Sequence, residues 1–231
     1  VSVANQPGPA MNRLLPLLLL PTLLACHRTA TDVDWVRPQP SATALYRVTF
    51  EATWSAATHP GDYPVGAHFS PLIGASHAAS GPGRFFQVGN LASPGIKNMA
   101  ELGSNAALRA EINALISQGH AFRLLDGRTA VSSPGVLTDT VRLRLDQPAV
   151  SVVTMIAPSP DWFAALDSEV LLSADGWAST RRVAARFYDA GTDSGPTYTA
   201  SDQPTTPAAP IQLMPGWSPA PYGYFVLELL K

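Results

Sequence analysis

The feature that most constrains the fold is a regular alternation of side-chain character between Leu45 and Trp54. Successive side chains of a β-strand point to opposite faces, so only a half-buried strand explains this period economically. We therefore predict a strand with one face in a core. Its inward face consists of Tyr46, Val48, Phe50, Ala52 and Trp54, and its outward face of Arg47, Thr49, Glu51 and Thr53.

Several other segments have strand character. Val141, Leu143 and Leu145 alternate with arginines, and residues 150–156, 183–188 and 224–230 are rich in β-branched, aromatic or aliphatic side chains. Such runs are typical of strands. They are separated by turn signals, which are Asp126-Gly127, Pro134-Gly135, Asp175-Gly176 and Pro215-Gly216.

One segment, residues 104–119, has a helical period instead. Leu108, Ile112, Leu115 and Ile116 recur at helical spacing, Ser104 or Asn105 can cap the start, and Gly119 can end it. A shorter helix over residues 96–102 is a second expectation. The predicted fold class is mainly β, an antiparallel β-sandwich with one or two short helices packed on it.

The beginning of the chain reads as a lipoprotein signal peptide. Met11-Asn12-Arg13 precedes an apolar run over residues 14–24, which is too short to span a bilayer, and Leu23-Leu24-Ala25-Cys26 fits a bacterial lipobox. We expect lipid on Cys26, the only cysteine of the 231 residues, and export to the outer membrane. A buried apolar helix is the alternative, but Pro16 and Pro21 would break it.

The expected domain organisation follows from this signal. Residues 1–25 are the upstream residues and signal peptide, residues 26–43 a flexible tether, and residues 44–231 a single domain. The formal net charge of −2, with 17 acidic against 15 basic side chains, argues against a nucleic-acid surface.

Two acidic turns each follow a strand-like run. The first is Pro158-Ser159-Pro160-Asp161-Trp162-Phe163, and the second is Asp189-Ala190-Gly191-Thr192-Asp193-Ser194-Gly195. If the turns meet, three carboxylates gather in loops, which suits a hard cation such as Ca²⁺. The alternative is that these are ordinary turn aspartates.

Further motifs occur in a fixed order along roughly residues 44–212. They are Tyr46-x-Val48-x-Phe50, Trp54-Ser55, His59-Pro60, Tyr63-Pro64, Phe69-Ser70-Pro71-x-x-Gly74-x-x-His77, Ala92-Ser93-Pro94-Gly95-Ile96 and Ala100-Glu101-Leu102-Gly103, followed by the two acidic turns. This order resembles the spondin domain family. The resemblance implies a sandwich of two antiparallel sheets with calcium at one end, held by Asp161, Asp189 and Asp193, in a module that animals use for matrix and cell adhesion.

The expected function is therefore a non-catalytic, calcium-binding, extracytoplasmic adhesion or ligand-binding module, anchored to the membrane as a lipoprotein through Cys26. Its partner would be a glycan or protein of the cell envelope or the extracellular space, and not a nucleic acid. The alternative is a carbohydrate-active protein or other hydrolase that uses the same loop end, for which Trp177 and Trp217 could be stacking platforms.

Two other constellations are weaker. His59, His68 and His77 could suggest zinc, but their nine-residue spacing suits no single helix or strand face. Ser70, His77 and Asp62 could form a nucleophile, base and orienting acid, but Ser70 lacks the Gly-x-Ser-x-Gly elbow.

Overall fold

The computed structural model describes Val1 and residues 39–61, 63–214 and 220–231. The predicted signal peptide, Cys26, Asp62 and Trp217 lie outside the described residues. Among the residues that are described, no helix is long and apolar enough to cross a membrane.

A four-stranded antiparallel sheet forms one layer. Its order is β11 (Thr180–Ala184), β14 (Gly223–Leu229), β1 (Thr43–Ala52) and β6 (Gly135–Arg144). β1 lies between β14 and β6, so the strand with the strongest alternation is central in its sheet.

An eight-stranded sheet forms the second layer. Its main path is β13 (Gln212–Leu213), β12 (Arg186–Asp189), β8 (Trp162–Val170), β7 (Ala149–Ala157), β2 (His68–Phe69) and β5 (Val131–Ser132). β3 (Ile73–His77) pairs with β7 and with β4 (Ala121–Asp126), so β2 and β3 follow each other along one edge of β7. A separate hairpin joins β9 (Leu172–Ser173) to β10 (Gly176–Trp177).

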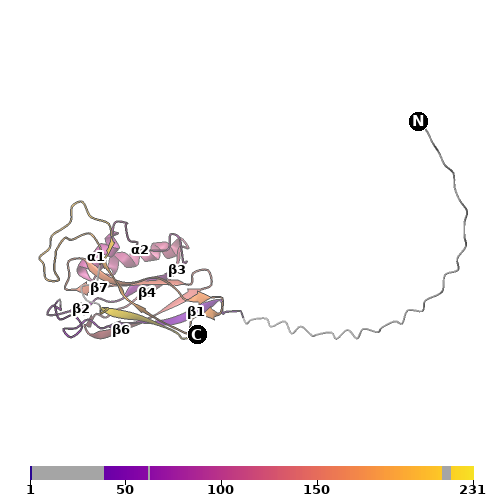
Figure 1. Cartoon of the computed structure of the whole chain (residues 1–231), viewed down its shortest axis with the longest axis horizontal. Helices are drawn as coiled ribbons and strands as arrows, with labels where there is room; N and C mark the ends of the chain where they lie inside the picture. Colours follow the sequence, from indigo (N-terminus) through magenta and orange to yellow (C-terminus); the bar gives the residue numbers. More distant parts are fainter. Residues whose placement is uncertain (2–38, 62, 215–219) are drawn as a thin grey trace, which may run out of the picture. The chain divides into compact units, whose positions relative to one another are not determined.

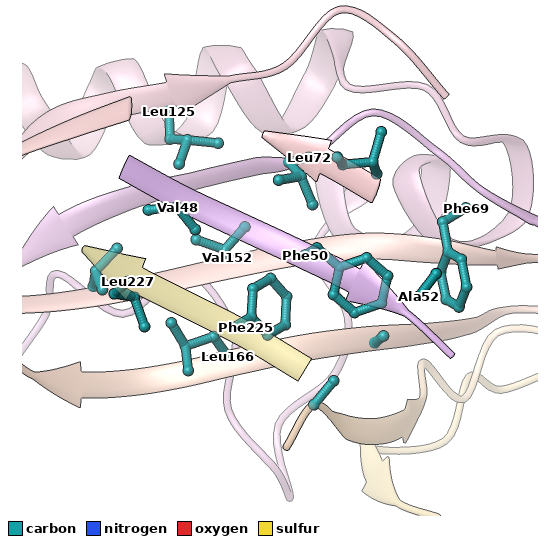
Figure 2. Packing of buried hydrophobic residues seen from close by; sticks show 14 of the residues in the cluster. Val48, Phe50, Ala52, Phe69, Leu72, Leu125, Val152, Leu166, Phe225 and Leu227 are labelled. Atoms are coloured by element: carbon teal, nitrogen blue, oxygen red, sulfur yellow. The ribbon is translucent and has the colours of Figure 1, made fainter. Parts of the chain in front are cut away.

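The main core lies between these two sheets. Phe50 of β1 is fully buried, with ring centroids 4.8 Å from Phe69 and 4.9 Å from Phe225. Figure 2 shows these rings surrounded by aliphatic side chains from both layers. The inward face predicted for β1 is confirmed, because Tyr46, Val48 and Phe50 have no exposed surface.

A second core covers the opposite face of the eight-stranded sheet. Helices α1 (Pro94–Leu102) and α2 (Ala106–Ser117) pack there, on the other side of β3 and β7 from β1 and β6 (Figure 1). β8 serves both cores, since Trp162, Ala164 and Leu166 face the first sheet while Phe163 and Ala165 face the helices. The domain is thus a β-sandwich with a helical layer on one sheet.

Both predicted helices are present. The Ser93 hydroxyl caps α1 by accepting a hydrogen bond from the Ile96 N–H at 3.1 Å, and Gly103 ends α1 in the left-handed conformation. The prediction of a mainly β antiparallel sandwich with one or two short helices is therefore confirmed.

Two sequence predictions are wrong. Residues 183–188 are not one strand, because β11 ends at Ala184 and β12 starts at Arg186 in the other sheet. The chain changes layers at Ala185, so Val183 and Phe187 both pack on the main core from opposite sides. Leu145 is not an inward residue of β6: the strand ends at Arg144 and Leu145 is 42% exposed.

Candidate metal site

The two acidic turns meet because β8 and β12 are antiparallel neighbours. Asp161 immediately precedes β8, and Asp189 is the last residue of β12, where it pairs with Trp162. The Ala190 N–H donates to the Asp161 backbone carbonyl at 3.2 Å, which joins the turns. Strand pairing therefore places carboxylates from positions far apart in the sequence at one end of the sheet.

Asp161 is fully buried and is held by the second turn. Its Oδ2 accepts hydrogen bonds from the Thr192 N–H at 2.6 Å, the Thr192 hydroxyl at 3.2 Å and the Asp193 N–H at 3.0 Å. Its Oδ1 is buried and has no hydrogen-bond partner in the described part of the chain. Burial raises the pKa of Asp161 to about 6, and the negative charge of Asp189 adds to the rise.

Asp189 and Asp193 each fold their own turn. Asp189 Oδ1 accepts from the Gly191 N–H at 2.7 Å, and Asp193 accepts from the Gly195 N–H at 2.7 Å and the Gln203 N–H at 2.8 Å. Burial raises the pKa of Asp189, and the Asp193 charge also raises it. Each of these two pairs, Asp161 with Asp189 and Asp189 with Asp193, is thus close enough for electrostatic repulsion.

Two glycines allow the second turn to adopt this geometry. Gly191 has a φ of +74°, and a Cβ there would lie 2.2 Å from the Ala209 carbonyl oxygen. A Cβ on Gly195 would lie 2.8 Å from Cγ of Pro160 in the first turn. The two turns therefore pack so closely that these positions exclude a side chain.

The donor set suits a hard cation. Among the described residues, Asp161 Oδ1 has no hydrogen-bond partner, and carboxylate oxygens that accept one N–H retain a second lone pair. Within the described residues, however, no three His, Cys, Asp or Glu side chains already converge as a complete metal cage. The structure thus brings Asp161, Asp189 and Asp193 to one end of the domain in repelling pairs.

Thr192 is a site residue that sequence reasoning missed. Its backbone and side chain both bind Asp161, and it is 6% exposed. Its position inside the Asp-Ala-Gly-Thr-Asp turn was the available signal, because hydroxyl side chains in turns commonly bind nearby acceptors.

The three histidines do not share a site. His59 is buried with its ring 4.1 Å from that of Tyr222, His68 is partly exposed on β2, and His77 is fully buried at the end of β3. No grouping of histidines that could hold a metal occurs where the structure describes the chain.

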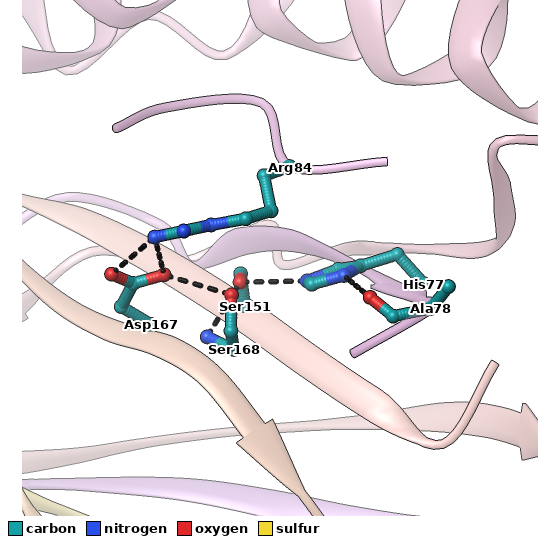
Figure 3. Close-up of polar contacts among 6 residues, drawn as sticks. All are labelled: His77, Ala78, Arg84, Ser151, Asp167 and Ser168. Atoms are coloured by element: carbon teal, nitrogen blue, oxygen red, sulfur yellow. Dashed lines mark hydrogen bonds and ion pairs between the residues drawn. The ribbon is translucent and has the colours of Figure 1, made fainter. Parts of the chain in front are cut away.

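His77 pairs with Ser151 instead of Ser70. The Ala78 carbonyl can only accept, so His77 Nδ1 donates to it at 2.7 Å and Nε2 accepts from the Ser151 hydroxyl at 2.8 Å (Figure 3). Burial lowers the pKa of His77, which favours this neutral form. The Ser168 N–H also donates to Ser151 Oγ at 2.9 Å. Ser70 is engaged elsewhere, because its Oγ accepts from the Met155 N–H at 2.9 Å.

The Ser151–His77 pair is closed off from solvent. Ser151 is 1% exposed and His77 has no exposed surface. Beside them, the Arg84 guanidinium binds both oxygens of Asp167 at 2.9 and 2.8 Å, as Figure 3 shows. A serine–histidine pair without access for a substrate acts as an internal hydrogen-bonded brace between β3, β7 and β8.

The tryptophans divide between core and surface. Trp54 is buried, as predicted for the inward face of its strand, and Trp162 is buried as well. Trp177 is partly buried: its Nε1 donates to the Ser41 carbonyl at 2.9 Å, and its ring meets Tyr46 edge-on at 6.4 Å. These contacts make Trp177 a packing residue at the start of β1.

Comparison with known proteins gives consistent matches. The family model described as Spondin_N matches residues 44–221. Spondin-1 of Bos taurus and of Homo sapiens are each 37% identical over 182 residues, covering 74% of this chain but 22% of Spondin-1. Spondin-2 of Homo sapiens is 31% identical over 231 residues, covering 98% of this chain and 69% of Spondin-2. The chain therefore spans less than a quarter of the length of Spondin-1.

Proposed function

Because this chain belongs to the spondin N-terminal domain family, we propose that it is an exported, non-catalytic module for adhesion or ligand binding. Its loop end holds one Ca²⁺ through Asp161, Asp189 and Asp193. Family membership supports an extracellular adhesion or ligand-binding role, and the two repelling carboxylate pairs support the metal.

The observation that carries the calcium proposal is the buried, incompletely hydrogen-bonded carboxylate of Asp161. Its Oδ1 is buried without a hydrogen-bond partner among the described residues, and a second, partly buried carboxylate, that of Asp189, repels it. A buried anionic oxygen without compensation is strongly unfavourable, and a cation would remove both the desolvation penalty and the repulsion. Oxygen donors alone favour Ca²⁺ over zinc.

Calcium should therefore stabilise the folded protein. An ion that binds the folded state and not the unfolded chain raises the melting temperature as its concentration rises. We expect this rise for the wild type, and a much smaller one for Asp189→Asn, which removes one charge and weakens one ligand. Thermal unfolding of metal-stripped protein across a calcium titration measures both.

The matched control is Asp202→Asn, which removes an exposed carboxylate in the following loop, outside the proposed ligand set. This variant should respond to calcium like the wild type. Equal responses of Asp189→Asn and Asp202→Asn would rule out the proposed ligand set.

Anchoring through Cys26 is a separate part of the proposal. The sequence Leu23-Leu24-Ala25-Cys26 supports lipidation and placement in the outer membrane, with a glycan or protein of the envelope or exterior as ligand. Metabolic labelling with a fatty acid should mark the protein, and Cys26→Ser should abolish the mark. A label that survives in Cys26→Ser would disprove this anchor.

The hydrolase alternative receives less support. The Ser151–His77 pair has the hydrogen-bond order of a nucleophile and base, but both residues are inaccessible. A binding module therefore agrees better with the chemistry of the described residues.

A further inference from the structure

A cleft of about 580 Å³ opens beside the loop end, on the helical side of the eight-stranded sheet. The C-terminal end of α1, the strands β2 and β7, and residues 198–200 surround it. Met155, Pro158 and Leu102 provide apolar surface, and His68 and Thr199 provide polar groups. This volume lies in the range of ligand-binding pockets, roughly 300–1,000 Å³.

The described lining of the cleft carries no permanent charge. None of the described residues that line it is Asp, Glu, Lys or Arg. Burying an anionic or cationic group there would leave the charge without a partner, which is unfavourable. The lining therefore selects a ligand group without charge.

Its rim and floor are apolar and adaptable. Leu102 at the end of α1 is 71% exposed although it is a large apolar side chain. Met155, with its flexible thioether, can adjust to different apolar shapes, as methionines do at protein-binding surfaces. Covering these two side chains would remove apolar surface from water.

The polar groups suit a peptide backbone. The Gly66 carbonyl can only accept, so the His68 ring, which is part of the lining, donates to it from Nδ1 at 2.7 Å. Thr199 adds a hydroxyl donor. An extended peptide offers the complementary N–H and C=O groups on either side of each side chain.

A sugar fits less well. Sugar recognition commonly uses an exposed aromatic face, but Tyr198, the aromatic residue of the lining, is only 8% exposed. Its ring is already packed against Trp54 at 4.9 Å and Trp162 at 5.0 Å. The cleft thus lacks an accessible aromatic stacking platform among its described residues.

One wall is fixed by the acidic turn. Asp193 accepts hydrogen bonds from the N–H groups of Gly195 and Gln203, which closes the loop that contains Tyr198 and Thr199. A preformed wall lowers the entropy lost on binding.

We propose that this cleft receives one uncharged, apolar side chain and its flanking backbone from an extended segment of a partner protein. The inference rests on the ligand-binding role proposed above but does not require calcium. It specifies where the partner binds and which chemistry it presents.

Methionine-methyl NMR of the full chain tests this with small probes. N-acetyl-leucinamide should shift the Met155 methyl signal saturably, with a Kd in the millimolar range expected for so small a ligand. N-acetyl-glycinamide, which lacks the side chain, and methyl glucoside should bind at least about fivefold more weakly. Buried Met99 is the internal reference and should not respond.

The matched variants are Leu102→Arg at the rim and Leu91→Arg, which is 62% exposed and not part of the lining. Leu102→Arg should weaken the leucinamide response about fivefold or more, and Leu91→Arg should leave it unchanged. The proposal is overturned by no saturable shift, by equal responses in the two variants, or by preference for the glucoside. Repeating the titration in chelator separates the two proposals. The shift of the Met155 methyl signal should persist without calcium, whereas the rise in melting temperature depends on calcium.

Discussion

Asp161 is the residue on which the site depends. A carboxylate with no exposed surface is uncommon unless paired, yet Oδ1 of Asp161 has no partner among the described groups, while Oδ2 accepts three hydrogen bonds. Burial of this carboxylate raises the pKa of Asp161 to about 6. Without a cation, Asp161 of the folded protein therefore stays protonated up to a higher pH than in the unfolded chain.

This raised pKa predicts that the stability of the metal-free protein depends on pH. A carboxyl group whose folded-state pKa is raised stabilises the fold fully below its unfolded pKa of 3.8, and that contribution is lost as the pH rises through about 6. Asp161→Asn cannot ionise, so it should escape this loss. In chelator, the melting temperature of Asp161→Asn relative to wild type should rise between about pH 4 and about pH 7.

Thermal unfolding of both proteins across this pH range measures the difference. Asp202→Asn again serves as the control and should stay parallel to the wild type. A constant difference between Asp161→Asn and wild type would show that Asp161 does not titrate in this range.

At the scale of elements, strand β1 was the most predictable part of the fold. Its alternating pattern specifies a face, and the structure places that face in the core between the sheets. The same pattern predicts a large difference between neighbouring positions. Phe50→Ala should destabilise the protein by about 3–5 kcal/mol because it leaves a cavity between Phe69 and Phe225.

Thr49→Ala, on the opposite face, should change the free energy of unfolding by about 0.5 kcal/mol or less. Its hydroxyl lies 3.4 Å from that of Thr138, which is a long surface contact. Chemical denaturation of the two variants measures both values. Similar losses at both positions would mean that the strand register is wrong.

Local patterns could not predict where the chain changes layers. Residues 183–188 form an unbroken run of strand character, but Ala185 moves the chain from β11 in one sheet to β12 in the other. Tyr198 likewise lies outside any named strand or helix, yet it is buried against Trp54 and Trp162. In both cases contacts between distant segments decide the structure, and these contacts leave no local period.

The candidate site was predictable only in part. Asp161, Asp189 and Asp193 could be chosen because each stands in a turn after a strand-like run, and their meeting follows from the pairing of β8 with β12. The turn position of Thr192 indicated a hydroxyl that binds an acceptor, but the sequence did not reveal which acceptor. Thr192 binds Asp161 and Ser151 binds His77, and each partner is at least 31 positions away.

For the whole molecule, the eight-stranded sheet is the common support. It forms one wall of the main core, carries the helices on its other face, and positions both acidic turns and the adjoining cleft. A rigid sheet with loops gathered at one end is a suitable frame for a binding module, because the frame holds the loops in place without ligand.

The most direct test of the account is isothermal titration calorimetry of metal-stripped protein with Ca²⁺. We predict one ion per chain, with a Kd of roughly 10⁻⁴–10⁻³ M, typical of extracellular calcium modules. Asp161→Asn and Asp189→Asn should each weaken binding severely, whereas Asp202→Asn should not. Absence of saturable calcium binding by the wild type, or unchanged affinity in Asp161→Asn and Asp189→Asn, would contradict the account.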